Sequence, residues 1–323
     1  MAASPLSGVL VVDKPAGPTS FQTVSRVRRA LRVGKAGHAG TLDPAATGVL
    51  VVCLEDAVRL QPFLTEGDKS YEATVAFGTA TTTQDAEGRV VEEGDASGLS
   101  GEAIARALGR FLGEIEQVPP MFSAVRVGGR RLHEAARAGE EVERPPRRVQ
   151  VHRLELLHLT PTEAGRRLAR VLVECGKGTY VRTLAADLGR SLGVPAHLAA
   201  LRRTCSSGFT LEEAIPLERI EVLAGQGGPE ALAGRIVPNA LALVGLPEAR
   251  VSPAEARDLA FGRPIASGLL LGAGAPPSAL GMRPPGAARV RAVDEKLRLV
   301  AVCEARGDRL WPVRVFVAAA DLS

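Results

Sequence analysis

Apolar and polar residues alternate most regularly from Lys69 to Gly78, where apolar side chains occupy every second position. A period of two residues is typical of a strand with one buried face. Alternation or short apolar runs predict further strands at Gly8–Asp13, Val49–Leu54, Pro119–Val127, Val149–Leu159 and Arg167–Cys175. These segments are sufficient to build one large sheet.

Helical periodicity separates the predicted strands. The segment Ser20–Val33 follows a Pro-Thr-Ser start signal, and one helix face collects Phe21, Val24, Val27 and Leu31. Further helices are predicted at Ser100–Gly113, Arg130–Ala138 and Tyr180–Leu192. Because helices and strands are not arranged in a regular βαβ order, we expect an α+β fold with a mixed, mainly antiparallel sheet and flanking helices.

A second unit is predicted after Leu246-Pro247, so that the domains comprise residues 1–246 and 247–323. It contains a short helix at Pro253–Phe261 and a Gly-, Pro- and Ala-rich loop at Gly268–Ala287. Three short strands follow, at Ala288–Val293, Leu297–Glu304 and Leu310–Val317. This spacing predicts a small C-terminal β-barrel. Its role is either to contact phosphates of a nucleic acid or to cap the fold, and the candidate cations are Arg283, Arg289, Arg291 and Arg298.

Composition restricts the class of protein. The chain has 323 residues, a formal charge of +4 and a pI near 9.1, which permits nucleic-acid binding without requiring it. Its four Cys and five His residues show no metal-ligand spacing, which fits buried thiols in a reducing compartment. No secretory signal or membrane-spanning apolar run occurs, so we expect a cytoplasmic protein without a membrane partner.

The segment Gly37–Leu50 contains the main candidate for chemistry, the carboxylate of Asp43. Pro44 forces Asp43 out of the helical backbone region, and Gly40 and Gly48 permit conformations that other residues rarely adopt. A single acid on such a shaped loop suits a presented reactive group. The alternative is an Asp-Pro turn whose carboxylate bonds its own backbone.

The residues that precede Asp43 form a basic segment without acids. From Lys14 to Leu42 there is no Asp or Glu, and the cations are Lys14, Arg26, Arg28, Arg29, Arg32 and Lys35. Such a segment would attract a polyanion and leave one carboxylate for chemistry. A solvated helix face explains the helical cations equally well, but it does not explain the missing acids.

The chain has two tyrosines, and both lie next to cations. Tyr71 follows Lys69-Ser70, and Tyr180 lies in Lys177-Gly178-Thr179-Tyr180-Val181-Arg182. A tyrosine ring can stack on a nucleobase, and its hydroxyl can reach a polar edge. Arg182 could pair with an acid such as Asp43 and orient it. The alternatives are a packed strand residue for Tyr71 and a helix-capping aromatic for Tyr180.

Several of these motifs resemble those of the bacterial tRNA pseudouridine synthase B family. The similarity covers residues 8 to about 215 in the family's order, and the segment Gly37–Gly48 is the most specific match. The other matching segments are Gly8–Pro15, Lys69–Tyr71, Val118–Ala124, Lys177–Thr183 and Leu201–Arg203. The C-terminal unit resembles the PUA-like RNA-binding barrel of that family.

This resemblance implies the pseudouridine synthase fold and isomerisation of uridine to pseudouridine at position 55 in the TΨC stem-loop of tRNA. Asp43 would be the nucleophile, attacking C1′ or C6 or abstracting a proton, on a base that is flipped out of the RNA. Tyr71 would stack on the uracil, and Tyr180 would lie near it. Arg182 would pair with Asp43, Leu201 would line the pocket and His38 would fill the gap in the RNA. The resemblance implies no cofactor, no metal, no obligate protein partner and a monomer.

Other functions remain open at this point. A non-catalytic RNA-binding module would use the same basic surface. An Asp-nucleophile phosphohydrolase would need Mg²⁺ and a second carboxylate, and the nearest acids in sequence are Asp13 and Glu55. Within the resembled group, guide-RNA-dependent relatives similar to dyskerin are a further alternative, although the chain lacks basic tails.

Overall fold

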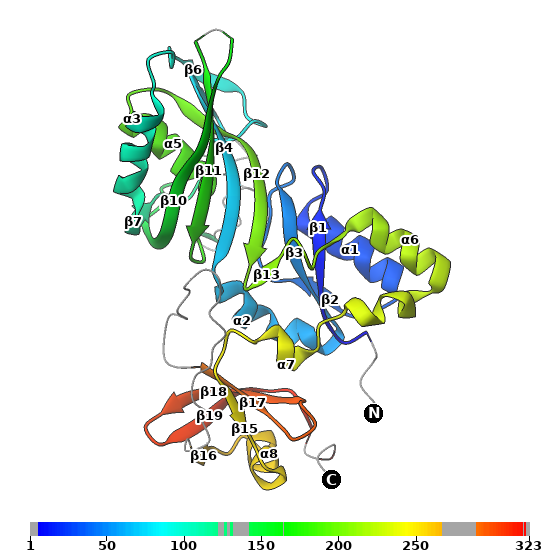
Figure 1. The fold of residues 1–323 in the computed structure, drawn as a ribbon. Helices are drawn as coiled ribbons and strands as arrows, with labels where there is room; N and C mark the ends of the chain where they lie inside the picture. The colour runs from blue at the N-terminus through cyan, green and yellow to red at the C-terminus, as the bar shows by residue number, and fades with distance from the viewer. Residues whose placement is uncertain are drawn as a thin grey trace.

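The computed structural model describes residues 6–121, 126–127, 130–131, 142–163, 165–266, 289–318 and 320. In this part of the chain, a large sheet carries helices, and a smaller sheet lies at one end of the molecule (Figure 1). The large sheet has ten strands and the smaller one has five. No helix in the described ranges is long and apolar enough to cross a lipid bilayer.

The strands of the large sheet follow the order β14-β1-β3-β12-β4-β11-β10-β7, with β2 on β3 and β13 on β12. The pairs β1/β14 and β12/β3 are parallel, and the other pairs are antiparallel. The expected α+β class with a mixed, mainly antiparallel sheet is therefore confirmed. The strands are β1 Gly8–Lys14, β2 Ala36–His38, β3 Thr47–Leu54, β4 Lys69–Phe77, β7 Gly113–Gln117, β10 Arg147–Pro161, β11 Arg167–Cys175, β12 Ala196–Ser206, β13 Phe209–Thr210 and β14 Ile215–Pro216.

Two groups of helices cover two parts of this sheet. α1 (Ser20–Leu31) and α6 (Leu217–Gly227) pack with β1 and β3 around one apolar cluster. α3 (Gly101–Leu108) and α5 (Val181–Ser191) pack with β4 and β11 around another. Figure 1 shows the two groups to either side of β4 and β12. The short helices α2 (Gln61–Glu66) and α7 (Asn239–Ala242) lie nearer the smaller sheet (Figure 1).

α1 begins where its sequence predicts. Thr19 caps it, because the Thr19 hydroxyl accepts a hydrogen bond from the Gln22 amide and the Gln22 side chain accepts one from the Thr19 amide. Val24, Val27 and Leu31 are buried, but Phe21 is 75% exposed. The expectation that Phe21 shares their face is wrong. At about 100° per residue, Phe21 lies roughly 60° or more around the helix from each of those three residues.

Three predicted segments need correction. The helix expected over Ser100–Gly113 ends at Leu108, a 3-10 turn follows, and β7 begins at Gly113, whose φ of +87° permits the change of direction. Pro119 and Pro120 lie outside any strand, because proline lacks the N–H that a ladder needs. Among the described residues of the predicted strand Pro119–Val127, only Arg126–Val127 form a strand, β8.

The helix expected over Arg130–Ala138 is also wrong where it is described. Residues Arg130–Arg131 form strand β9, which pairs with β8 (Arg126–Val127). The remainder of that predicted helix lies outside the described residues. The central strand β12 had no counterpart in the prediction, since two arginines interrupt its apolar pattern at positions 202 and 203. A further hairpin joins β5 (Thr79–Thr81) to β6 (Val90–Glu93).

The smaller sheet has the strand order β15-β17-β18-β19-β16 and curls into a half-barrel rather than a closed barrel. The three predicted C-terminal strands correspond to β17, β18 and β19, and the predicted short helix is α8 (Pro253–Ala260). The predicted loop Gly268–Ala287 lies outside the described residues. The strands are β15 Glu248–Arg250, β16 Ile265–Ala266, β17 Arg289–Val293, β18 Leu299–Arg306 and β19 Arg309–Val315.

The two sheets share an apolar cluster. Val293, Leu299 and Val302 of the smaller sheet belong to the same buried cluster as Val9 and Val49 of the large one. This shared core holds the C-terminal unit against the remainder of the chain. The division of the chain at residue 246 stays a prediction.

Three of the predicted phosphate-binding arginines have partners within the protein. Arg291 is buried and donates hydrogen bonds to the carbonyl oxygens of Ala240 (2.7 Å) and Leu246 (3.3 Å). Arg289 pairs with Glu66 of α2 at 2.9 Å, and Arg298 pairs with Asp294 at 2.8 Å. Arg283 lies outside the described residues. These arginines therefore stabilise the junction or the sheet itself.

Removal of residues 247–323 is expected to lower the thermal unfolding midpoint of the remaining chain. The truncation takes away the apolar partners of Val9 and Val49, and each large buried side chain contributes about 1.5–3 kcal/mol. Circular-dichroism melts of the truncated and full-length proteins measure the difference. Equal midpoints would contradict a shared core.

Candidate active site

Asp43 lies in the loop that joins β2 to β3 near the middle of the large sheet. The loop makes a turn in which the Ala46 amide donates to the Asp43 carbonyl oxygen at 3.1 Å. Gly48 has a φ of +101° and lies so close to Arg203 on β12 that a Cβ there would collide with the Arg203 carbonyl oxygen. The chain therefore needs glycine where the loop enters β3.

Two buried cations hold the loop on both sides of Asp43. Lys14 at the end of β1 is fully buried, and its ammonium donates to the carbonyl oxygens of Pro44 (3.0 Å) and Ala46 (2.7 Å) as well as to that of Pro15 (2.9 Å). The guanidinium of Arg203 binds the other side. It is 1% exposed and donates to carbonyl oxygens at Gly40 (3.1 Å), Thr41 (3.3 Å) and Val49 (2.7 Å).

The N-terminal end of α1 also binds this loop. The Ser20 hydroxyl donates to the Leu42 carbonyl oxygen at 3.0 Å and accepts from the Leu42 amide at 2.8 Å. The Gly17 amide donates to the Pro44 carbonyl oxygen at 2.9 Å. The residues on both sides of Asp43 are thus bonded to the segment that starts α1.

The Asp43 carboxylate forms a two-point ion pair with Arg182 in the first turn of α5. Nε of Arg182 is 3.0 Å from Oδ2 of Asp43, and Nη2 is 3.4 Å from Oδ1. The Arg182 side chain is 7% exposed, whereas that of Asp43 is 40% exposed. Nη1 of Arg182 contacts Oδ2 of Asp85 at 3.3 Å and the Thr83 carbonyl oxygen at 3.4 Å. Arg182 therefore presents a partly accessible carboxylate from a buried position.

The surroundings shift the pKa values of this group and its neighbours. Burial raises the pKa of Asp43 above its ordinary value, the Arg182 charge opposes that rise and the Asp85 charge adds to it. Burial lowers the pKa of Lys14 to about 8, although the Asp43 charge acts in the opposite direction. The ionised carboxylate is thus less favourable here than in water, and Arg182 is its main stabilising neighbour.

Tyr71 and Leu201 lie beside the Asp43 loop. Tyr71 on β4 is 8% exposed and belongs to the same buried cluster as Leu42 and Ala46, against which Leu201 of β12 also packs. Burial raises the pKa of the Tyr71 hydroxyl, and the nearby Arg203 guanidinium lowers it. Both predicted residues therefore flank the loop that carries Asp43.

Tyr180 and His38 occupy the margins of this site. Tyr180 is the residue before α5, two positions from Arg182, and its backbone bonds to the Gln117 side chain at 3.0 and 3.3 Å. His38 ends β2, and its Nδ1 is buried without a hydrogen-bond partner among the described residues. Burial, followed by the Arg203 charge, lowers the pKa of His38. No described hydrogen bond or ion pair joins His38 or Tyr180 to Asp43.

Sequence reasoning missed three residues of the site. Arg203 and Lys14 lie within matching segments of the sequence, and Lys14 also belongs to the basic segment, but neither is predicted as a site residue. Asp85 has no place among the predicted site residues, because its partner Arg182 lies 97 positions away in the chain. No local pattern reveals such a pair. The acids nearest to Asp43 in sequence have other partners, since Asp13 pairs with Arg202 at 2.8 Å and Glu55 accepts the Gly34 amide at 2.6 Å.

Comparisons with known proteins show which family the chain resembles. Residues 28–181 match the family model of the TruB family pseudouridylate synthase N-terminal domain, and residues 182–243 match that of the tRNA pseudouridylate synthase B C-terminal domain. The tRNA pseudouridine synthase B of Symbiobacterium thermophilum is 54% identical over 251 residues, which are 78% of this chain and 80% of that protein. Its namesake in Geobacillus kaustophilus is 47% identical over 253 residues, 76% of this chain and 86% of that protein.

A solved structure extends the likeness to nearly the whole chain. The structure titled "Crystal Structure of a Cbf5-Nop10-Gar1 Complex" contains a chain with a TM-score of 0.75 and 27% identity. The match covers 98% of this chain and 87% of that one. The fold and these relatives define an enzyme of the pseudouridine synthase class, an isomerase. Within that class, the chain belongs to the TruB family of pseudouridylate synthases, which confirms the resemblance of its motifs.

Asp43→Asn is expected to raise the free energy of unfolding at neutral pH. A carboxyl group whose pKa is higher in the folded than in the unfolded state favours the fold when protonated, so the fold loses stability as pH rises through that interval. The advantage of the variant should therefore begin near pH 4, the ordinary pKa of the carboxyl group, and grow as the pH rises in urea titrations.

Glu221→Gln is a control with the opposite expected effect on stability, because the pKa of Glu221 is lowered in the fold and that of Asp43 is raised. The hydrogen bond from Arg26 lowers the pKa of Glu221, so this variant should be less stable than the parent at neutral pH. An Asp43→Asn protein that is less stable than the parent at pH 7 would show that the pair with Arg182 outweighs burial.

Proposed function

We propose that this protein isomerises uridine to pseudouridine at position 55 in the TΨC arm of tRNA, with Asp43 as the nucleophile on a flipped-out base. The observation that supports it best is the partly exposed Asp43 carboxylate, paired with buried Arg182 on a loop that Lys14 and Arg203 hold. The names of the curated relatives support tRNA as the substrate.

The proposed reaction breaks the glycosidic bond between C1′ and N1 of uracil, rotates the base in place and joins C1′ to C5. The proton that leaves C5 is balanced by the proton that N1 gains, so no electron or group leaves the nucleotide. A carboxylate that is already ionised needs no activating base. Asp43 attacks C1′ or C6 or abstracts a proton in this scheme, and Oδ1, with the longer contact to Arg182, is the oxygen more easily released for it.

The charged residues around Asp43 hold its carboxylate and its loop in place before the substrate binds. Arg182 orients the carboxylate, and Asp85 and the Thr83 carbonyl hold the guanidinium in turn. Lys14 and Arg203 fix the backbone on both sides of Asp43 before substrate arrives. A reacting group that is held in place beforehand requires less reorganisation in the transition state.

The flipped base would meet the residues around the loop. Extrusion of a base from the RNA costs a few kcal/mol, and stacking on one aromatic ring returns about 1–3 kcal/mol. We assign that stacking to Tyr71, which is 8% exposed and lies beside the Asp43 loop. Leu201 lines the pocket, Tyr180 provides a hydrogen bond or a proton near the base, and His38 fills the gap left in the RNA.

We further propose a stand-alone cytoplasmic monomer that needs no cofactor. The curated relatives are tRNA enzymes at 54% and 47% identity, whereas the Cbf5 chain, which was solved in a complex with other proteins, is 27% identical. This difference favours the tRNA enzyme over a guide-RNA-dependent relative. A non-catalytic RNA-binding module would have no use for the unfavourable burial of Asp43.

Asp43→Asn is expected to reduce pseudouridine formation in a tRNA transcript by at least about a thousandfold, because loss of a nucleophile removes the covalent or proton-transfer step. Binding of the same tRNA should stay close to that of the parent protein. Asp187→Asn is the matched control, since Asp187 is also partly buried, pairs with an arginine and has a raised pKa. Substantial turnover by the Asp43 variant would exclude Asp43 as the nucleophile.

Excess EDTA is expected to leave pseudouridine formation on prefolded RNA unchanged. The sequence has no metal-ligand spacing, and the described part of the chain has no cluster of three or more His, Cys, Asp and Glu side chains suited to a metal. The phosphohydrolase alternative needs Mg²⁺ between two carboxylates, and Arg182 occupies the space between Asp43 and Asp85. Loss of activity in EDTA that Mg²⁺ restores would favour that alternative.

A further inference from the structure

One side of α1 carries an exposed aromatic ring and two exposed cations. Phe21, Ser25, Arg28 and Arg32 recur at intervals of four, three and four residues, which places them on one stripe of the helix. Phe21 is 75% exposed, and Arg28 and Arg32 are also exposed. Lys35, three residues after the helix cap at Arg32, continues the stripe as a third exposed cation.

The cations of this stripe are not neutralised within the described part of the protein. Arg26, on the flank of the helix, pairs with Glu221 at 2.6 Å and Glu218 at 3.6 Å of α6. By contrast, the side chains of Arg28, Arg32 and Lys35 form no ion pair or hydrogen bond with any described residue. A helix face stabilised only by solvation would commonly intersperse acids among such cations, and this segment has none.

An open groove lies beside the stripe. It has a volume of about 470 Å³ and is lined by Gly17, Pro18, Gln22, Ser25, Arg26 and Arg29. The groove and the stripe share Ser25, so that they lie next to each other on α1. Arg29 on the wall of this groove places a further cation where it could meet a phosphate-bearing chain.

This surface is joined directly to the loop that carries Asp43. Ser20, next to Phe21, exchanges two hydrogen bonds with Leu42, and Gly17 of the groove donates to Pro44. With a rise of about 1.5 Å per residue, the stripe extends roughly 17 Å from Phe21 to Arg32. The Phe21 end of the stripe therefore adjoins the Asp43 loop.

We propose that the exposed face of α1 from Phe21 to Lys35 binds the RNA strand that flanks the nucleotide in the active site. Arg28, Arg32 and Lys35 contact consecutive phosphates, and Phe21 stacks on a base or ribose next to the flipped one. This proposal rests on the proposed function, because it takes the same RNA as its ligand. It extends the RNA contacts from the pocket to a surface outside the catalytic loop.

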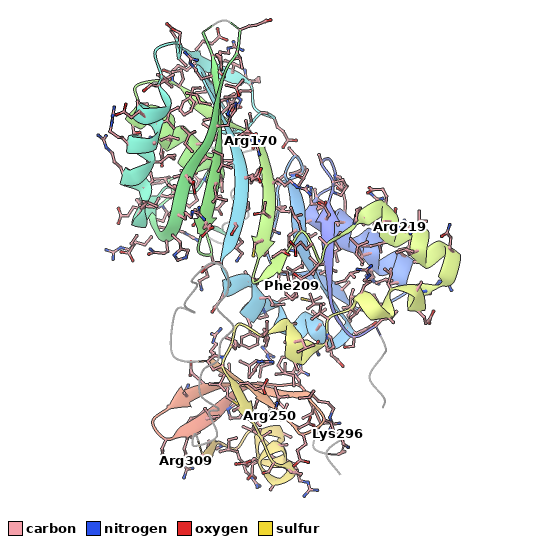
Figure 2. The ribbon with its side chains drawn as sticks, in the orientation of Figure 1. Arg170, Phe209, Arg219, Arg250, Lys296 and Arg309 are labelled. Carbon is pink, nitrogen blue, oxygen red and sulfur yellow. The ribbon has the colours of Figure 1, made fainter. Side chains whose placement is uncertain are left out.

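The cations are tested with an Arg28→Gln/Arg32→Gln/Lys35→Gln variant and a fluorescein-labelled, unmodified tRNA transcript. Each lost phosphate contact should reduce the slope of log K against log salt by about 0.7–0.9, so that the slope falls by about 2 in total. Affinity at 150 mM NaCl should fall at least about tenfold. A triple Gln variant at Arg106, Arg110 and Arg170 has the same change in net charge and should keep the parent slope; Arg170 lies on β11, away from α1 (Figure 2).

Phe21 is tested separately, because stacking on a base releases no counterions and therefore does not change the salt dependence of binding. Phe21→Ala should weaken tRNA binding about tenfold at an unchanged salt slope, Phe21→Trp should restore it and Phe21→Leu should not. Phe261→Ala is the matched control, because Phe261 is 65% exposed but belongs to the C-terminal unit. All of these side chains are exposed, so melting temperatures should stay at the parent value.

An assay of pseudouridine formation by the parent protein distinguishes a failure of this proposal from a failure of the proposed function on which it rests. If the parent protein forms no pseudouridine in tRNA, the proposed function fails. If it is active while the triple Gln and Phe21→Ala variants keep the parent affinity and salt slope, the α1 surface does not bind RNA. Equal losses in the Arg106/Arg110/Arg170 control would also overturn the proposal, since they would reflect net charge alone.

Discussion

The Asp43 loop is held by two charges that lie where water cannot reach them. Lys14 and Arg203 each donate three hydrogen bonds to carbonyl oxygens, and most of these oxygens belong to the loop or to the start of β3. Burial of a cation without a carboxylate partner is unfavourable. It lowers the pKa of Lys14 to about 8, which corresponds to a cost near 3 kcal/mol at neutral pH. The fold tolerates this cost because removal of either cation would leave buried carbonyl groups unsatisfied.

The same arrangement explains the electrostatics of Asp43. A carboxylate in a partly buried loop is disfavoured by desolvation, and its pKa is raised accordingly. Arg182 limits that rise from one side, and Lys14 does so from beneath the loop. Asp85 holds Arg182 but opposes the ionisation of Asp43. The burial that fixes the position of Asp43 therefore also disfavours its charge. Functional sites commonly accept such a loss of local stability, because the reactive group must be held in place.

The two helix groups meet at this loop. α1 reaches it through Ser20 and Leu42, and α5 reaches it through Arg182 and Asp43. The smaller sheet is attached to the opposite end of β1 and β3 by the cluster that contains Val9 and Val302. The two helix groups are thus bonded directly to the loop, whereas the smaller sheet is connected to it through the apolar core around β1 and β3.

Much of the fold follows from the sequence alone. The alternation at Lys69–Phe77, the capped start of α1 and the three C-terminal strands are local patterns, because burial on one face leaves a period of two or 3.6 residues. The Gly- and Pro-rich loop around Asp43 is likewise visible without a structure. Pro119 and Pro120 show the limit of prediction from apolar patterns. An apolar run that contains prolines can be mistaken for a strand, although proline has no N–H to donate to a neighbouring strand.

Only the tertiary structure decided which side chains surround Asp43. Asp85 and Arg203 reach the site from positions far away in the chain, and no local pattern marks them because their partners are chosen by the sheet order. The same holds for Phe21, whose apolar character predicts burial while the packing of α1 against α6 leaves it in solvent. Sequence periodicity determines which residues can share a face. Packing between distant elements determines which of those faces are covered and which charges remain free to bind a ligand.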